Sequence, residues 1–109
     1  MQKQVEDAIN LIITAFNNHF DDFHGLYLYG IHADGKSHKD EDIELVAIFD
    51  VENKTKREFI WPIIGKIETD LDVFIDLHPI TMEELEKDED FYDDVVNQGI
   101  FFKIDEAIK

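Results

Sequence analysis

The sequence has no cysteine, only two prolines and five glycines, and only ten basic residues among its 109. The absence of cysteine excludes disulfide bonds and metal sites built on thiolates. No apolar run approaches the roughly 20 residues that a membrane-spanning helix needs. The first residues also lack the basic segment and the apolar run of a signal peptide. We therefore expect a soluble, cytoplasmic protein that has no contact with a membrane.

Acidic residues dominate the charge, because the chain has 26 Asp and Glu residues but only ten Lys and Arg residues, which gives a net charge of −16. Such a surface repels the phosphate backbone, so we expect no nonspecific binding of nucleic acid. The charge fits a basic protein partner, or a polyphosphate that arrives with a divalent cation. The alternative is that it only keeps the protein soluble. Hydrophobic residues make up 44% of the chain, and the length predicts one globular domain over 1–109.

Apolar residues recur with helical spacing in some segments and form short runs in others, which predicts amphipathic helices and buried strands. This order of elements predicts an α/β or α+β sandwich, with a small mixed sheet and helices packed on one face. The expected elements are a helix at 3–20, strands at 26–29 and 43–49, a helix at 55–71, a strand at 73–77, a short helix opened by Thr81, a helix at about 88–97 and an edge strand at 100–102.

Proline and polar residues mark where these elements are expected to break. Pro62 should kink or restart the helix at 55–71, and the His78-Pro79 pair should close the third strand. Residues 31–41 are polar and read as a loop or a short helix. We expect His32 and His38, in this segment, to be surface loop residues rather than ligands.

Three acidic residues interrupt the predicted strands. Asp42 and Glu44 are two positions apart at the start of a strand, so their side chains point to the same face. Two carboxylates this close do not both stay ionised without cost unless a cation lies between them. Asp76 is a third acid in an apolar strand, and it converges on the pair if the two strands are neighbours. Each acid alone is explained by a strand end that meets water, but the three together favour a site.

A cluster of oxygen ligands without His or Cys is typical of Mg²⁺ or Mn²⁺ rather than zinc. None of the five histidines has the spacing of a zinc motif. A site of this kind binds the phosphates of a nucleotide and neutralises charge during phosphoryl or nucleotidyl transfer. The acids therefore predict a metal-dependent phosphate site.

The segment YGIHADGKSHKDEDIELVAIF, which begins at Tyr29, resembles the signature of the polymerase-beta-type nucleotidyltransferases. In that signature a strand ends in a glycine, a loop follows, and the next strand carries two acids in alternation. Here Gly30 stands at the first position and Gly35 in the loop. The paired acids correspond to Asp42-Ile43-Glu44-Leu45. The later segment Phe74-Ile75-Asp76-Leu77 is similar to the strand that carries the third acid, and the likeness covers about residues 5–105.

The resemblance to minimal nucleotidyltransferases implies their fold and the transfer of a nucleoside monophosphate from ATP or another nucleoside triphosphate, with Mg²⁺, to an acceptor. Asp42 and Glu44 would hold the metals, and Asp76 would assist the second metal or act as a general base. The resemblance also implies a HEPN-type partner protein, with this chain as the antitoxin of a toxin–antitoxin pair. The nucleotide-binding positions that it implies are Gly30, Ile31, Gly35, Lys36 and Lys39.

Two residues of the loop depart from the family pattern. Ile31 stands where the family has Ser or Gly, and a β-branched side chain crowds the approach of a triphosphate without donating a hydrogen bond. Asp34 would repel a phosphate, whereas Lys36 and Lys39 supply positive charge. The alternative to an active enzyme is therefore a catalytically degenerate nucleotidyltransferase-like protein that neutralises a basic partner by contact.

Overall fold

The computed structural model describes residues 2–34 and 40–103. In the part of the chain that it describes, no helix is both long and apolar enough to cross a bilayer. The elements, in chain order, are α1 (Lys3–His19), β1 (Phe23–Tyr29), the 3₁₀ helix η1 (Gly30–Asp34), β2 (Ile43–Phe49), α2 (Lys54–Leu71), β3 (Ile75–Thr81), α3 (Met82–Glu86), α4 (Glu89–Tyr92), the π-helix η2 (Asp93–Asn97) and β4 (Ile100–Phe102).

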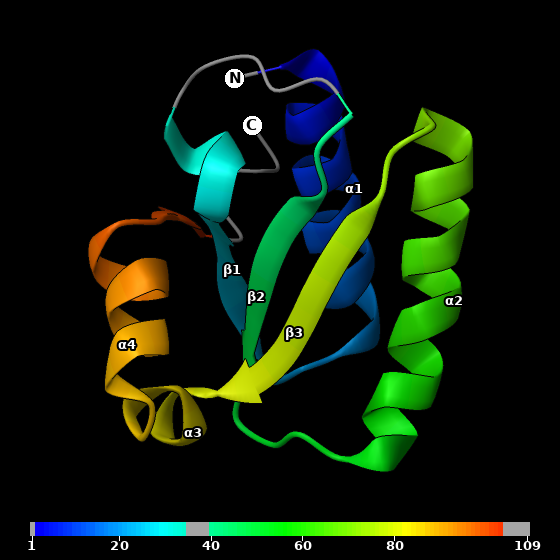
Figure 1. Ribbon diagram of the computed structural model, residues 1–109. Helices are drawn as coiled ribbons and strands as arrows, with labels where there is room; N and C mark the ends of the chain where they lie inside the picture. The colour runs from blue at the N-terminus through cyan, green and yellow to red at the C-terminus, as the bar shows by residue number, and fades with distance from the viewer. Residues whose placement is uncertain (1, 35–39, 104–109) are drawn as a thin grey trace.

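Four strands form one sheet in the order β3-β2-β1-β4. β1 is antiparallel to both β2 and β4, whereas β2 and β3 are parallel, so the sheet is mixed as predicted. The parallel pair requires a crossover, and α2 provides it (Figure 1). The apolar tail forms the edge strand β4 against β1, which confirms the expectation for 100–102.

Alternate residues of β2 point to the two faces of the sheet. The helix-layer face carries Ile43, Leu45, Ala47 and Phe49, and the long helices α1 and α2 pack against it. We call the other face, which carries Glu44, Val46 and Ile48, the cleft face. The short helices α3, α4 and η2 cover part of it through residues such as Leu85 and Val95 (Figure 1).

The helix-layer face is closed at one end by an aromatic cluster. Phe16 of α1 is fully buried, and its ring lies 5.5 Å from that of Phe23 and 5.9 Å from that of Phe49. The Lys56 ammonium group lies 4.5 Å from the centroid of the Phe49 ring and 2.6 Å from a carboxylate oxygen of Asp22. Aromatic burial of this kind contributes a large share of a small domain's stability, and the lysine is partly buried beside its counter-charge.

Two expected element breaks are absent from the structure. β3 does not close at His78-Pro79 but continues to Thr81, because it is an edge strand in which the missing N–H of Pro79 faces no partner strand. Its beginning is also later than predicted, at Ile75. α2 is one continuous helix that contains Pro62, so the helix does not restart there. The Thr81 side chain accepts a hydrogen bond from the Glu84 N–H, as the predicted helix start required.

Candidate active site and its cleft

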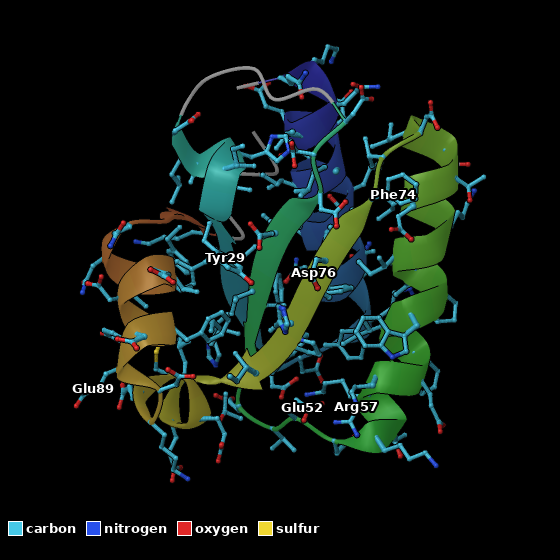
Figure 2. The ribbon with its side chains drawn as sticks, in the orientation of Figure 1. Tyr29, Glu52, Arg57, Phe74, Asp76 and Glu89 are labelled. Carbon is cyan, nitrogen blue, oxygen red and sulfur yellow. The ribbon has the colours of Figure 1, made fainter. Side chains whose placement is uncertain are left out.

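Two of the predicted acids lie side by side on the cleft face. Glu44 is directly paired with Asp76 across the parallel β2–β3 ladder and with Tyr29 across the antiparallel β1–β2 ladder. Residues that pair across strands project from the same face, so the three side chains form one row across three strands. Figure 2 shows Asp76 on β3 and Tyr29 beside the α4 segment, on either side of β2. The strands of Glu44 and Asp76 are thus neighbours, which was the condition for the acids to converge.

Asp42 lies just outside this row. It is exposed and immediately precedes β2. Among residues 2–34 and 40–103, no three His, Asp or Glu side chains are close enough together to form a group that could hold a metal ion. The structure therefore brings Glu44 and Asp76 to adjacent positions and leaves Asp42 at the rim, without gathering the three carboxylates into one group.

Gly30 lets the Glu44 carboxylate lie against the turn that follows β1. Its backbone is in the left-handed region, with φ at 73°. A Cβ atom added at Gly30 would overlap Oε2 of Glu44. Any other residue here would both strain the backbone and displace the carboxylate. Gly30 and Glu44 are therefore coupled sterically, a relation that the sequence pattern alone did not contain.

The rest of the predicted loop is described only in part. Ile31 is the second residue of η1 and has 39% of its surface exposed, and Asp34 ends the helix. His32 is buried, with 3% exposed, and its Nε2 lies 2.9 Å from the carbonyl oxygen of Glu41. The expectation of a surface position for His32 is thus wrong, because this histidine packs inward and donates to the segment that leads into β2. The predicted positions Gly35, Lys36, His38 and Lys39 lie outside the described residues.

A cleft of about 480 Å³ opens beside the Glu44 carboxylate. Its lining from β1 and η1 includes Tyr29, Gly30 and Asp34, and Asp94 of η2 and the following Gln98 line it as well. No sequence pattern pointed to Asp94 or Gln98. In the sequence Asp94 is one of many acidic residues between positions 83 and 94, and only the packing of η2 on the cleft face brings it to the site.

Burial, together with the acids of the cleft, raises the pKa values of Glu44 and Tyr29. Burial raises the pKa of Glu44 most, followed by the negative charges of Asp76 and Asp42. Burial likewise raises the pKa of Tyr29 well above its usual range, and Glu44, Asp76 and Asp94 add to the effect. Among the residues that the structure describes, negative charge therefore outweighs positive charge at this cleft, although His78 and His32 partly oppose the effect on Glu44.

His78 also lies at this site, although no motif in the sequence pointed to it. Its Nε2 lies 3.4 Å from Oδ1 of Asp76, two positions earlier on the same face of β3. The ring of Phe91 packs edge-on against His78 at 5.8 Å and against Tyr29 at 5.5 Å. Asp76 and His78 are two positions apart on a strand, so the sequence could have predicted that they lie on the same face. No sequence pattern predicted that Phe91 of α4 would pack against them.

The donors at this site fit a hard divalent cation in their chemistry. Glu44 and Asp76 provide carboxylate oxygens on directly paired residues, and oxygen ligands are what Mg²⁺ and Mn²⁺ prefer. A cation would also relieve the repulsion that raises the pKa of Glu44. The carboxylates are not preassembled around one point, so a metal would be held chiefly by the Glu44–Asp76 pair.

Several solved structures resemble this chain, although no family model and no curated protein matches its sequence. One is a toxin–antitoxin structure with AMP-PNP, at 22% identity and a TM-score of 0.62, which covers 94% of this chain and 78% of that one. Another is the toxin–antitoxin MntA–HepT, at 20% identity and a TM-score of 0.58, which covers 98% of this chain and 79% of that one. A third is a tri-AMPylated Shewanella oneidensis HEPN toxin in complex with MNT antitoxin. Its identity is 22% and its TM-score 0.58, and it covers 93% of this chain and 71% of that one.

At 20–22% identity the likeness concerns the fold. The aligned part includes most of the chain in each case, and the mixed four-stranded sheet with its helices matches the architecture of these neighbours. The comparison therefore confirms the fold that the sequence predicted: this chain has the α+β fold of the nucleotidyltransferase-like proteins.

Proposed function

We propose that this protein is a nucleotidyltransferase-type antitoxin. It binds ATP or another nucleoside triphosphate with Mg²⁺, transfers the nucleoside monophosphate to a hydroxyl group of a HEPN-type partner protein and releases pyrophosphate. The observation that carries the proposal is the directly paired Glu44 and Asp76, beside the Gly30 turn, on a fold whose solved examples include a complex with AMP-PNP. Support for the partner comes from the neighbour in which a HEPN toxin is AMPylated and bound to MNT antitoxin.

The proposal gives each residue of the site a role. Glu44 and Asp76 hold the metal, and Asp42 adds negative charge at the rim that attracts it. When bound, Mg²⁺ neutralises the charge of the phosphates during transfer. The turn at Gly30 lies against the Glu44 carboxylate, so a metal held by Glu44 would bring the phosphates to this turn. Lys36 and Lys39 remain the predicted source of positive charge.

Asp76 is also suited to receive the proton of the acceptor hydroxyl. It is exposed on β3, so an acceptor presented by a partner protein can reach it, which is the first requirement for a general base. Nε2 of the neighbouring His78 lies 3.4 Å from one of its carboxylate oxygens. Both roles that we propose for Asp76 use this position.

A second candidate function is neutralisation of a basic partner by contact, without transfer. Asp34 and Asp94 line the same cleft as Glu44, and both repel a triphosphate. Ile31 offers no hydrogen-bonding side chain at the start of η1, where the family pattern has Ser or Gly. These three residues favour a degenerate site, and an assay must therefore separate binding of the partner from transfer to it.

Incubation of the chain with Mg²⁺, ATP labelled at the α-phosphate and a HEPN-type protein tests the proposal. We expect label on the partner, and a loss of roughly 100-fold or more for Glu44→Gln and Asp76→Asn. Glu58→Gln, which removes an exposed carboxylate from α2, is the matched control and should transfer normally.

The same samples distinguish the two functions. A complex that co-purifies without any label, and that tolerates Asp42→Asn, supports neutralisation by contact and rules out transfer. Label that persists at full rate in Glu44→Gln and Asp76→Asn would show that the chemistry takes place elsewhere. If the partner neither binds nor becomes labelled, both functions are wrong.

A further inference from the structure

A second cleft, of about 400 Å³, lies at the opposite end of the cleft face. It is bounded by the end of β2 at Ile48 and Asp50, by the beginning of α3 at Met82 and Glu83, and by aromatic residues of β1 and β4. Glu44 and Asp50 are six residues apart along β2, or about 20 Å at the rise of a strand. The two clefts are therefore separate, and α3, α4 and η2 cover the sheet between them.

The apolar wall of this cleft is a fixed pair of aromatic rings. Tyr27 and Phe101 are paired residues of β1 and β4, and their ring centroids are 4.6 Å apart with 42° between the planes. The Phe101 ring occupies the space above Gly25, where an added Cβ would come within 2.6 Å of Cζ. Gly25, with φ at 150°, thus leaves the space that this ring occupies. Both rings are half-buried and line the cleft.

The rim of the cleft is acidic. Asp50 has 66% of its side chain exposed and lies 2.6 Å from His24 Nε2, and Glu83 is exposed on α3. These carboxylates belong to a chain of net charge −16. A nucleotide, a nucleic acid and an anionic membrane are all repelled by such a rim, and so is a second copy of this chain. Charge complementarity therefore selects a cationic occupant.

We propose that this cleft binds an arginine side chain of a basic protein partner. A guanidinium group is planar, so it stacks on aromatic faces such as Tyr27 and Phe101 while its N–H groups donate to carboxylates such as Asp50 and Glu83. The volume lies within the range of pockets that hold small ligands, and so accommodates one side chain with part of its backbone. The proposal does not depend on nucleotide transfer at the other cleft.

An NMR titration of the ¹⁵N-labelled chain with a capped tri-arginine peptide at low salt tests this assignment. We expect the largest amide shifts at Tyr27, Asp50, Glu83 and Phe101. A capped tri-lysine peptide has the same charge but no planar group, so it should bind this cleft several-fold more weakly. Equal affinity for the two peptides, with shifts spread over the acidic run from 83 to 94, would overturn the proposal.

Matched variants separate this cleft from general charge attraction. Glu83→Gln should weaken binding of tri-arginine about two- to fivefold. Glu89→Gln removes the same charge from the same acidic run, but Glu89 points away from the body of the protein (Figure 2), so its affinity should stay within the error of wild type. Equal weakening by the two variants contradicts a specific cleft.

Phe101→Leu keeps the apolar volume and removes the aromatic face. We expect it to weaken tri-arginine two- to fivefold and to leave tri-lysine less affected. If this variant unfolds, the pair Glu83→Gln and Glu89→Gln still decides the question. These measurements need neither nucleotide nor Mg²⁺, so failure of the docking proposal and failure of the transfer proposal are distinguishable.

Discussion

The two faces of the sheet are formed by the same strands, but they serve different purposes. On the helix-layer face every inward residue of β2 is apolar, and two long helices cover the row from Ile43 to Phe49. On the cleft face only the middle of the row is apolar, because the short elements α3, α4 and η2 are packed over Val46 and Ile48. The ends of this face stay open, and there the chain places Glu44 and the rim of the second cleft. Long helices thus complete a core, whereas short ones leave room for sites.

This difference predicts that the helix-layer face carries most of the folding stability. Phe16→Ala removes a fully buried ring that packs against Phe20, Phe23 and Phe49. We expect a loss of about 3–5 kcal/mol in the free energy of unfolding, measured by urea denaturation. A loss below about 1 kcal/mol would mean that this face is not the main source of stability.

Glycines provide the second test, because two of them lie in opposite surroundings. Gly30→Ala places a Cβ on the Glu44 carboxylate at φ 73°, so we expect a loss of about 2 kcal/mol together with displacement of that carboxylate. Gly65→Ala in α2 meets nothing within 4 Å and should stabilise the chain by about 0.5–1 kcal/mol. The same urea experiment reads both, and equal effects of the two substitutions would contradict the steric coupling of Gly30 and Glu44.

Asp22, at the aromatic end of the helix-layer face, is a carboxylate that accepts hydrogen bonds. Burial raises its pKa, but hydrogen bonds from Lys56 and the Val51 N–H outweigh this and lower the pKa overall. Its stabilising contribution is therefore present above the unfolded value of 3.8 and is lost as the pH falls through the folded pKa. Asp22→Asn should cost about 1 kcal/mol at pH 7 and progressively less below pH 3.8. A cost that does not change with pH would contradict this pairing.

Glu44 should behave in the opposite way. Burial, then Asp76 and Asp42, raise its folded pKa above 4.5, so its charged form destabilises the fold above that folded pKa. The penalty disappears as the pH falls towards 4.5. Glu44→Gln should stabilise the metal-free protein by a few tenths of a kcal/mol at pH 7 and have no effect near pH 4. Thermal unfolding across pH checks this, and destabilisation by Glu44→Gln at pH 7 would contradict the repulsion.

Most of the fold was predictable because it follows local apolar patterns. The strand at 43–49 has the predicted bounds, and α1 and α2 begin and end within one residue of their predictions. The failures involve neighbours that are distant in sequence. Pro79 stops a strand only where a partner needs its N–H, and β3 has none on that side. The strand predicted at 26–29 begins earlier, at Phe23, because Phe23 and Gly25 pair with Phe49 and Ile48 of β2 across a β-bulge.

The candidate site was predictable only along the strands. Alternation placed Asp42 and Glu44 on one face, and the parallel register put Asp76 beside Glu44. Packing of η2 then added Asp94 to the cleft, although it is fifty positions from Glu44, and no local pattern encodes such a contact. The roles of the three acids, and of Gly30 and Ile31, stay predictions until a ligand is bound.

The most direct test of the proposed function is a crystal structure of the chain with Mg²⁺ and a non-hydrolysable ATP analogue. We expect a metal held by Glu44 and Asp76, with the triphosphate against the turn at Gly30 and Ile31. A nucleotide bound away from this cleft, or a cleft without nucleotide at a saturating concentration, would contradict it.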